Sequence, residues 1–482
     1  MSRFTTNRNT RHDHSKPAQI QTCRHHSRRQ FIKSSLAAAA ALSTVCQPPV
    51  QKPNILFIFS DQQHWAALQH VDSFFRTPHL SELARHSVRF RQAVCTTPQC
   101  SPSRSSMLTG YYPHKTGVMG NIGAAGGDEL DQPTFALPLS QAGYRTACFG
   151  KWHLGYRPVS KQGWDIWDDR DPHHAAGPDA ETTRLALEFL KFTGDDKRPF
   201  CLTLSYVDPH DIYQFRSHTR PETIVPLPES WHRETFADKP PVHKQFMTED
   251  QGTAIYGKPK ELWQQYRDWY RIKVEKLDEQ VGQVIQYLRD NGLWESTVVL
   301  FTSDHGDMDA HHRLIYKGPF MYEQMLRVPL MIRVPSSLDG LSPTDSDVLT
   351  IGADIAPTIL DFAGCDVPDC DGRSLKPLLT GGIFRERAFA VSQYYSKQKW
   401  INPIRSIRSA DWKYNLYQSH AEELYDLRND PHERVNRVDD PGYAHMRNSL
   451  HDELKQWINR NEDPFVSLPV TDRLGNIKNS RQ

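Results

Sequence analysis

Four groups of polar and charged side chains each follow directly after an apolar run of the sequence. These groups are Asp61-Gln62, Lys151-Trp152-His153, Asp208-Pro209-His210 and Asp304-His305-Gly306-Asp307. Oxygen ligands such as those of Asp61, Gln62 and Asp304 suit Ca²⁺ or Mg²⁺. The lysine and histidines of the middle groups suit an anion. A metal together with cations predicts a tetrahedral oxyanion substrate, so we expect hydrolysis of a sulfate or phosphate ester.

Cys100 is the candidate nucleophile, and it lies in a Pro-rich turn just before a helical pattern at Ser103–Thr109 that Gly110 closes. Helix N-termini carry unpaired N–H groups and partial positive charge, which favour bound anions. If Cys100 lies on the first turn, Arg104 shares its face, with Cβ atoms about 5–6 Å apart. A single cysteine is more often structural, so the hypothesis rests on Cys100, Arg104 and the four groups together.

The four groups must be positioned by the apolar runs that precede them. These runs are residues 54–60, 144–150, 200–207 and 297–303. Because they are continuously apolar rather than alternating, they predict parallel strands covered on both faces. Helical patterns at 180–193 and 260–291 lie between them, which indicates an α/β layered fold. Ligands bind outside the carboxyl ends of such strands, so the four groups should meet in one site.

The remaining segments predict smaller units around this layer. Residues 217–259 are Pro-rich and irregular, and we interpret them as a loop near the mouth of the site. After about residue 380, strand-like pieces at 388–393 and 412–416 precede a helix at 443–459 and predict a small α+β domain. The expected organisation is an export signal and linker (1–52), a catalytic domain (53–380), a C-terminal subdomain (381–463) and a polar, poorly ordered tail (464–482).

The N-terminal segment has the composition of a targeting signal. Residues 1–33 hold eight Lys or Arg against the single acid Asp13, and Ser27-Arg28-Arg29-Gln30-Phe31-Ile32-Lys33 precedes the small apolar run Ser34–Val45. This layout predicts twin-arginine export to the periplasm or the extracellular space, with the twin-arginine machinery as a partner. The run is shorter than the ~20 residues that span a bilayer. A buried N-terminal helix behind a basic tail is the alternative, and Cys46 leaves lipid attachment open.

The net charge and the cysteine spacing of the chain after this signal argue against two classes of protein, nucleic-acid binders and zinc-binding domains. Removing the signal near residue 46 leaves 50 basic and 56 acidic residues, which argues against a nucleic-acid binder. No Cys-x-x-Cys and His set with zinc spacing is present. Cys365 and Cys370 can pair after export or remain free thiols.

One run of residues resembles the signature of a known family. Cys100-Ser101-Pro102-Ser103-Arg104, followed by Leu108-Thr109-Gly110, is similar to the Cys-x-Pro-Ser-Arg signature of type I, formylglycine-dependent sulfatases of the alkaline phosphatase superfamily. The agreement continues over about residues 53–460, at Asn54-Ile55-Leu56, Gly150-Lys151-Trp152-His153-Leu154-Gly155, Pro209-His210, Ser303-Asp304-His305-Gly306-Asp307, Lys317, Arg327-Val328-Pro329-Leu330, Glu423-Leu424-Tyr425-Asp426-Leu427, Asp430-Pro431 and Glu433. Within this family, the chain resembles bacterial carbohydrate sulfatases.

The resemblance implies a fold, a modified residue and a metal. The fold is a large mixed, mostly parallel sheet sandwiched by helices, plus a small C-terminal α+β subdomain with a short antiparallel sheet. Cys100 would be oxidised to Cα-formylglycine (3-oxoalanine) by a formylglycine-generating maturation enzyme. The implied ligands of the metal, Ca²⁺ in preference to Mg²⁺ or Mn²⁺, are Asp61, Gln62, Asp304, His305 and residue 100 itself.

The resemblance also implies a catalytic role for each remaining site residue. A hydroxyl of the hydrated aldehyde at residue 100, close to Arg104, would attack sulfur and form a covalent sulfate. Lys151 and Lys317 would hold sulfate oxygens, and His210 would protonate the leaving alcohol. His153 would then deprotonate the second hydroxyl, which expels sulfate and restores the aldehyde.

Two positions depart from the family pattern and keep rival functions open. Many members have Asp-Asp where this chain has Asp61-Gln62, so one negative charge is missing from the implied metal site. His305 stands where Asn is often found, a feature shared with phosphonate-ester relatives. The alternatives are a phosphodiesterase or phosphonate monoester hydrolase on the same scaffold, and an inactive sugar-binding homologue.

The substrate is expected to be a sulfated saccharide, because export favours extracellular polymers over cytosolic metabolites. Choline sulfate and aryl sulfates remain alternatives. Polar and aromatic residues near the site elements are candidates for sugar binding, although each is equally compatible with an ordinary loop residue. These candidates are His64, Trp65, His173, His174, Tyr213 and His312.

Overall fold

The computed structural model describes residues 52–478, apart from 157–158, 169–178, 194–195, 220, 222–223 and 420. The twin-arginine segment, Cys46, His173 and His174 therefore lie outside the described residues. Residues from Lys52 onward form one compact unit. Among the described residues, we find no helix with the length and apolarity needed to cross a membrane.

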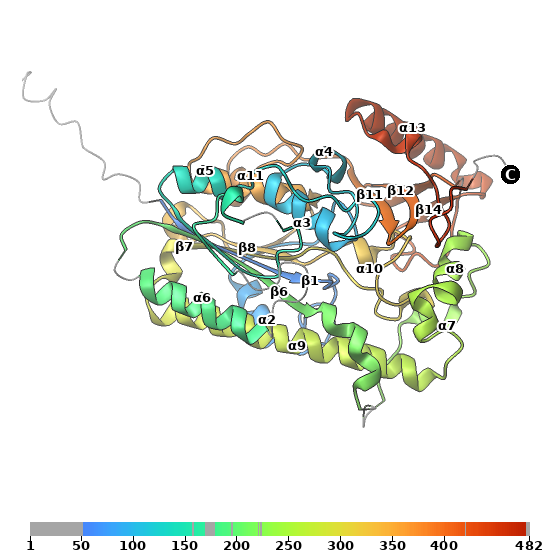
Figure 1. Ribbon diagram of the computed structural model, residues 1–482, viewed down its shortest axis with the longest axis horizontal. Coiled ribbons are helices and arrows are strands. Elements are labelled where there is room, and N and C mark those ends of the chain that lie inside the picture. The colour runs from blue at the N-terminus through green and yellow to red at the C-terminus, as the bar shows by residue number, and fades with distance from the viewer. Residues whose placement is uncertain are drawn as a thin grey trace, which may run out of the picture. The chain divides into compact units, whose positions relative to one another are not determined.

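A mixed, mostly parallel sheet forms the centre of this unit (Figure 1). Its strand order is β5 (Ile166–Trp167), β4 (Arg145–Gly150), β6 (Phe200–Pro209), β1 (Asn54–Asp61), β7 (Thr297–Ser303), β8 (Leu330–Arg333), β2 (Val88–Phe90) and β9 (Thr344–Ser346). Strands β4, β6, β1 and β7 are mutually parallel, whereas β8 runs antiparallel to both β7 and β2. Every residue of β6 and β7 is buried, as their continuous apolar character predicted.

Helices cover both faces of this sheet (Figure 1). On one face lie α2 (Pro78–Arg85), α6 (Asp179–Thr193) and α9 (Lys260–Asp290). On the other lie α3 (Cys100–Thr109), α5 (Ala136–Gln141) and α11 (Ile355–Phe362). Each face has its own buried apolar cluster. The α/β sandwich and the helices at 180–193 and 260–291 are therefore confirmed.

The register of the parallel strands brings the predicted side-chain groups to one edge of the sheet. Ser60 pairs with Ser303, and Asp61 pairs with Pro209. Gly150 pairs with Ser205 on the other side of β6. The residues after β1, β4, β6 and β7 therefore emerge at the same edge, as predicted from the strand ends.

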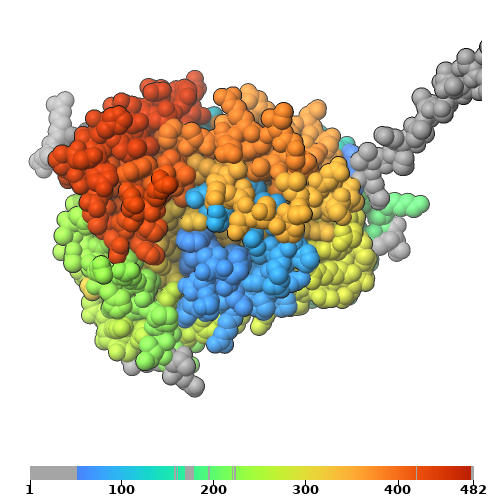
Figure 2. Space-filling view, turned by 180° about the vertical axis from the view of Figure 1, so that it is seen from behind, coloured from blue at the N-terminus to red at the C-terminus, as the bar shows by residue number. Residues whose placement is uncertain are grey.

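The C-terminal region forms a second sheet, which is antiparallel and packs against the sandwich of the first sheet and its helices. Its order is β11 (Ala390–Lys397), β12 (Trp400–Arg408), β13 (Trp412–Tyr417) and β14 (Glu422–Asp426), with α13 (Ala444–Arg460) packed on β12 and β13. Figure 2 shows the C-terminal part of this region in red, at the upper left of the molecule. Buried residues of both regions share one apolar cluster. The predicted short antiparallel sheet is confirmed.

Two segments are more ordered than their composition predicted. Within residues 217–259 the structure has α7 (Glu229–Arg233) and α8 (Pro241–Glu249) instead of a continuous irregular loop. Proline is compatible with the first turn of a helix, and Pro241 occupies that place in α8. The described part of the tail also packs on the C-terminal sheet, because Thr471 donates from Oγ1 to the Lys399 carbonyl at 2.7 Å and Phe465 is buried.

Candidate active site

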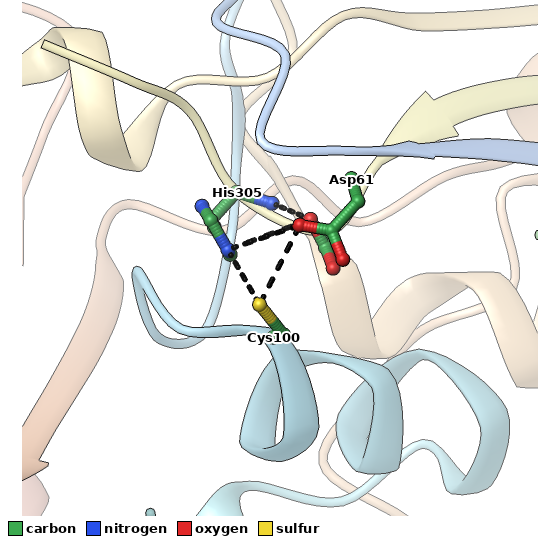
Figure 3. Close-up of side chains that lie close together, drawn as sticks. Asp61, Cys100 and His305 are labelled. Atoms are coloured by element: carbon green, nitrogen blue, oxygen red, sulfur yellow. Dashed lines mark hydrogen bonds and ion pairs between the residues drawn. The ribbon is translucent and has the colours of Figure 1, made fainter. Parts of the chain in front are cut away.

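Cys100 is the first residue of α3, and its side chain points toward the ends of two sheet strands (Figure 3). Its Sγ lies 3.5 Å from Oδ1 of Asp61, which ends β1, and 3.2 Å from Nε2 of His305, which follows β7. Cys100 is fully buried. The sequence predicted a turn at Cys100 and a helix from Ser103, whereas α3 already begins at Cys100 and places it on the first turn.

Positive charge surrounds the thiol. Lys317 donates from Nζ to the Cys100 Sγ at 3.1 Å. Burial alone would raise the pKa of the Cys100 thiol, but Lys151, Lys317 and His305 outweigh burial and hold that pKa well below its ordinary value. The position at the N-terminus of α3 adds partial positive charge from the backbone. The pocket around residue 100 is therefore suited to negative charge.

Arg104 lies one turn further along α3 and is fully buried. Its guanidinium donates from Nη2 to Oδ2 of Asp61 and from Nε to Oδ2 of Asp304, both at 2.9 Å. It also donates from Nη1 to the carbonyl of Lys151 at 2.5 Å and to Oγ of Ser205 at 2.7 Å. A planar fork suits several acceptors at fixed angles. Arg104 thus connects the carboxyl ends of β1, β4, β6 and β7.

Gln62 turns the chain sharply after β1. Its φ is +73°, a left-handed conformation that is uncommon outside glycine and clusters at functional sites. Its Nε2 donates to Oδ2 of Asp307 at 2.6 Å, and its Oε1 accepts from Nζ of Lys317 at 2.5 Å. Asp307 is held in turn by the hydroxyl of Tyr266, which donates to Oδ1 at 2.6 Å. The amide of Gln62 therefore presents its oxygen to the site.

Four side chains meet closely enough to share a metal ion. Ligand atoms of Asp61, Cys100, Asp304 and His305 all lie within 4.8 Å of one another. The Nδ1 of His305 lies 2.8 Å from the Gly306 carbonyl, so a proton on Nδ1 leaves Nε2 free to act as a ligand. Burial and the nearby Asp61 raise the pKa of the Asp304 carboxyl, and a cation between the two carboxylates would relieve both effects. This donor set fits a divalent cation.

Lys151, His153 and His210 lie at the same edge of the sheet. Lys151 donates from Nζ to Oδ2 of Asp61 at 2.5 Å. Burial and Lys151 lower the pKa of His153 and of His210 to about 4 in each case. Both imidazoles are therefore neutral near pH 7 and able to accept a proton. Nδ1 of His153 has no hydrogen-bond partner among the described residues, which leaves it free for a ligand.

A cavity of about 340 Å³ opens onto this cluster. Its lining residues are Gln99, Asn121, Ile122, Ala124, His153, His210, Tyr213, Gln251, Lys317, Ser396, Lys397 and Gln398. They come from the residue before α3, from the loop at 121–124, and from the segments after β4, β6 and β7. The segment after α8 and the end of β11 with its turn complete the lining. The volume suits a small ligand such as a monosaccharide or disaccharide.

A family model described as sulfatase matches residues 53–365, about two thirds of the chain. The chain belongs to the sulfatase family. A second model, for the C-terminal region of N-sulphoglucosamine sulphohydrolase, matches residues 311–460, and a twin-arginine translocation signal matches residues 25–44. The protein is therefore a sulfuric ester hydrolase with a signal that indicates export.

This sulfatase is similar over most of its length to enzymes of known name. It is 32% identical to a choline-sulfatase of Rhizobium meliloti, covering 81% of this chain and 83% of the relative. It is 28% identical to an N-acetylglucosamine-6-O-sulfatase of Bacteroides thetaiotaomicron, covering 88% and 90%. The solved structure of a 2-O GAG sulfatase superimposes with a TM-score of 0.77 at 27% identity, covering 87% of this chain and 95% of that one.

The predicted sugar-binding residues of the sulfatase lie in different places. Tyr213 lines the cavity and stacks on Tyr316 at 4.2 Å between ring centroids. His64 is buried against Tyr270, and His312 is buried and stacked on Tyr322. Neither histidine lines the cavity of the active site.

Trp65 contributes to a separate cavity of this sulfatase. That cavity also involves Arg89, Arg91 and Arg327, and the Arg327 guanidinium lies 3.8 Å from the Trp65 ring centroid. Trp65 follows the turn at Gln62 and its backbone N–H donates to the Arg327 carbonyl at 3.1 Å. This contact holds the indole away from the catalytic cluster.

Several residues that support the sulfatase site were not predicted from the sequence. Ser205 supports Arg104, while Asp307 and Tyr266 orient Gln62. Asp307 belongs to the motif after β7, but its contact with Gln62 could be identified only from the structure. Lys397 and Gln251 line the cavity from distant segments and carry no local sequence signal.

Proposed function

We propose that this sulfatase removes sulfate from sulfated saccharides through a formylglycine that a maturation enzyme makes from Cys100. The observation that carries the proposal is the position of Cys100 at the start of α3, where Lys317, His305 and Asp61 lie 3.1, 3.2 and 3.5 Å from Sγ. The sulfur stands in for the oxygen that the modified residue would carry. A nucleophile there faces positive charge suited to an anionic ester.

Asp61, Gln62, Asp304 and His305 are proposed to hold Ca²⁺ together with residue 100. When bound, the ion supplies charge stabilisation at the oxygen atoms of the reacting sulfate. Arg104 would fix Asp61 and Asp304, because its Nη2 and Nε donate to both carboxylates. This geometry supports a positioning role for Arg104, since its donors contact ligands rather than the cavity.

The remaining residues would handle the sulfate oxygens and the protons. A hydroxyl of the hydrated aldehyde forms a bond to sulfur as the bond from sulfur to the alcohol oxygen breaks. His210, which is neutral before the reaction, would accept the proton of the attacking hydroxyl and deliver it to the alcohol oxygen. Lys151 and Lys317 would hold the other sulfate oxygens. His153 would then take the proton of the second hydroxyl, so that the carbonyl re-forms and sulfate leaves. The neutral state of His153 near pH 7 supports its role as the base.

A saccharide substrate is supported by the relatives and by the site. The similar N-acetylglucosamine-6-O-sulfatase is named for a sugar, and so is the N-sulphoglucosamine sulphohydrolase of the C-terminal match. The cavity presents amides and a tyrosine that suit sugar hydroxyls. The twin-arginine signal supports action in the periplasm or outside the cell, where sulfated polysaccharides occur.

Turnover of matched esters tests this proposal. Purified protein, expressed with a formylglycine-generating enzyme, is offered an aryl sulfate, sulfated saccharides, a phosphate monoester, a phosphate diester and a phosphonate monoester. We expect the highest kcat/KM for sulfate esters. Faster turnover of the diester or the phosphonate ester would instead support the rival phosphodiesterase or phosphonate monoester hydrolase. Saccharide binding without turnover of any ester, in protein shown to contain formylglycine, would support the inactive binding homologue.

A further inference from the structure

Lys397 places a second cationic group in the catalytic cavity. It is the last residue of β11, the edge strand of the C-terminal sheet that lies nearest to α3 in Figure 1. Lys397 pairs with Trp400, so Gln398 and Lys399 form a two-residue turn at the tip of the hairpin. Ser396, Lys397 and Gln398 line the cavity together with the catalytic Lys317.

Hydrogen bonds hold this hairpin tip against the segment that carries the nucleophile. Gln99, next to Cys100, donates from Nε2 to the Ser396 carbonyl at 2.5 Å. Ser396 donates from Oγ to the Ala125 carbonyl at 2.6 Å. The Ala125 N–H donates to the Gln398 carbonyl at 2.9 Å. Lys397 is therefore positioned relative to the reacting centre rather than attached to a free loop.

The amine of Lys397 lines the cavity and is also held by neighbouring groups of the protein. It donates to Oε1 of Gln251 at 2.7 Å and to the Lys317 carbonyl at 2.9 Å, while an ammonium group has three donors. Oδ2 of Asp250 forms a longer ion pair with the amine at 3.5 Å, and the amine lies 4.3 Å from the centroid of the Phe246 ring. The Lys397 side chain is 11% exposed. The ion pair with Asp250 is the longest of the three polar contacts, so an anion in the cavity can take the third donor in its place.

The cavity around this amine is cationic. None of its described lining residues is acidic, whereas two are lysines. Burial lowers the pKa of Lys397 to about 7, with Asp250 opposing that shift and Lys317 adding to it. An anion bound beside the amine would favour its charged form. A cationic substrate group would instead meet two amines and one aromatic ring, Tyr213.

We propose that Lys397 and Gln251 form a subsite for a second anionic group of the substrate, a carboxylate or a second sulfate, beside the sulfate that is removed. This inference rests on the proposed function, and it narrows the substrate to saccharides that carry two anionic groups. Lys317 links the proposed subsite to the reacting centre, because its amine contacts Cys100 and its carbonyl accepts a hydrogen bond from Lys397. The proposed subsite also disfavours choline sulfate as a substrate, because its quaternary ammonium group would face Lys397.

Pairs of substrates that differ by one anionic group test the subsite. Suitable pairs are glucosamine 6-O-sulfate with glucosamine 2-N,6-O-disulfate, and a sulfated hexose with the matching sulfated hexuronate. Choline sulfate and an aryl sulfate complete the set. We expect wild-type enzyme to prefer the dianionic member of at least one pair by ~10-fold or more in kcat/KM, as a charge-assisted contact implies. Preference for the monoanionic members or for choline sulfate would overturn the subsite.

Variants of the hairpin tip supply the second measurement. Lys397→Met should reduce the ratio of kcat/KM for the preferred dianionic saccharide to that for the aryl sulfate by ~10-fold or more. Lys397→Arg should retain most of that ratio. Lys399→Met is the matched control, because Lys399 is exposed on the same turn and does not line the cavity. An unchanged ratio in Lys397→Met would overturn the proposal.

The two proposals fail in different ways. If the aryl sulfate is hydrolysed but the Lys397→Met ratio is unchanged, the subsite is wrong and the sulfatase activity stands. If matured wild-type enzyme hydrolyses no sulfate ester, the proposed function is wrong, and the proposed subsite, which rests on that function, is wrong as well.

Discussion

The side-chain amide of Gln62 donates from Nε2 to Oδ2 of Asp307 at 2.6 Å, which fixes the direction of its oxygen. We expect Asp307→Ala to weaken metal binding by ~10–100-fold, because groups that orient metal ligands typically contribute that much. Asp307→Asn should lose less, since an asparagine oxygen can still accept from Gln62. Isothermal titration of metal-free protein with Ca²⁺ measures the change directly.

Asp366→Asn is a control for this comparison, because Asp366 is exposed and lies away from the cluster. Its metal affinity should equal that of the wild type. Wild-type Ca²⁺ affinity in Asp307→Ala would show that Gln62 does not need Asp307 to present its oxygen.

Arg104→Lys should destabilise the fold as well as abolish turnover. Lysine cannot reproduce the donors that Arg104 directs to Asp61, Asp304 and Ser205, so buried acceptors would lose their partner. Losing buried hydrogen bonds to charged acceptors costs about 1.5–3 kcal/mol of unfolding free energy. Chemical denaturation measures this loss.

Arg184→Ala is the matched comparison, because Arg184 forms ion pairs with Glu181 and Glu188 on the exposed side of α6. Such surface pairs add little to stability, so we expect little change in the denaturation midpoint. Equal midpoints for Arg104→Lys and wild type would contradict the central position of Arg104.

The acidic limb of the pH–rate profile reports on His153. Burial and Lys151 lower its pKa to about 4, and a base acts in its neutral form. The kcat/KM should therefore be retained as the pH falls below 6.5 and should be lost as it passes through about 4. Stopped assays across this range in constant ionic strength give the limb. A loss of activity centred near pH 6.5 would indicate an ordinary histidine and contradict this environment.

Removal of the metal should inactivate the enzyme and lower its thermal stability. Asp61 and Asp304 lie close together in a buried cluster, so a cation stabilises the folded state there. Adding Ca²⁺ at 100 times its Kd should contribute about 2.7 kcal/mol. Scanning calorimetry after treatment with a chelator, followed by Ca²⁺, Mg²⁺ or Mn²⁺, compares the ions. Unchanged melting temperature and activity after chelation would contradict a metal site.

The convergence of the catalytic groups could be predicted from the sequence because it depends on strand direction alone. Runs that are apolar throughout form parallel strands, and parallel strands end at one edge. Asp61 and Asp304 follow two such strands, and their positions were predicted without knowledge of loop conformation. Cys100 was placed by its turn and by the helix that follows it.

Loop conformation and distant contacts limited the remaining predictions. The chain turns at Gln62, whose φ is left-handed. Beyond this turn His64 lies in the interior and Trp65 lies beside Arg327, although both residues are close to Asp61 in sequence. Lys397 reaches the cavity from a hairpin almost three hundred residues after Cys100, and its place depends on how the second sheet packs. Sequence proximity to a catalytic residue was therefore a poor guide to the substrate pocket.

The state of residue 100 is the most direct test of the account. Peptide mass spectrometry of protein produced with its maturation system measures it, because formylglycine weighs ~18 Da less than cysteine once the thiol has been replaced by an aldehyde. We predict that the peptide containing residues 100–104 has this lower mass in active enzyme. An unmodified Cys100 in enzyme that turns over sulfate esters would contradict the proposed mechanism.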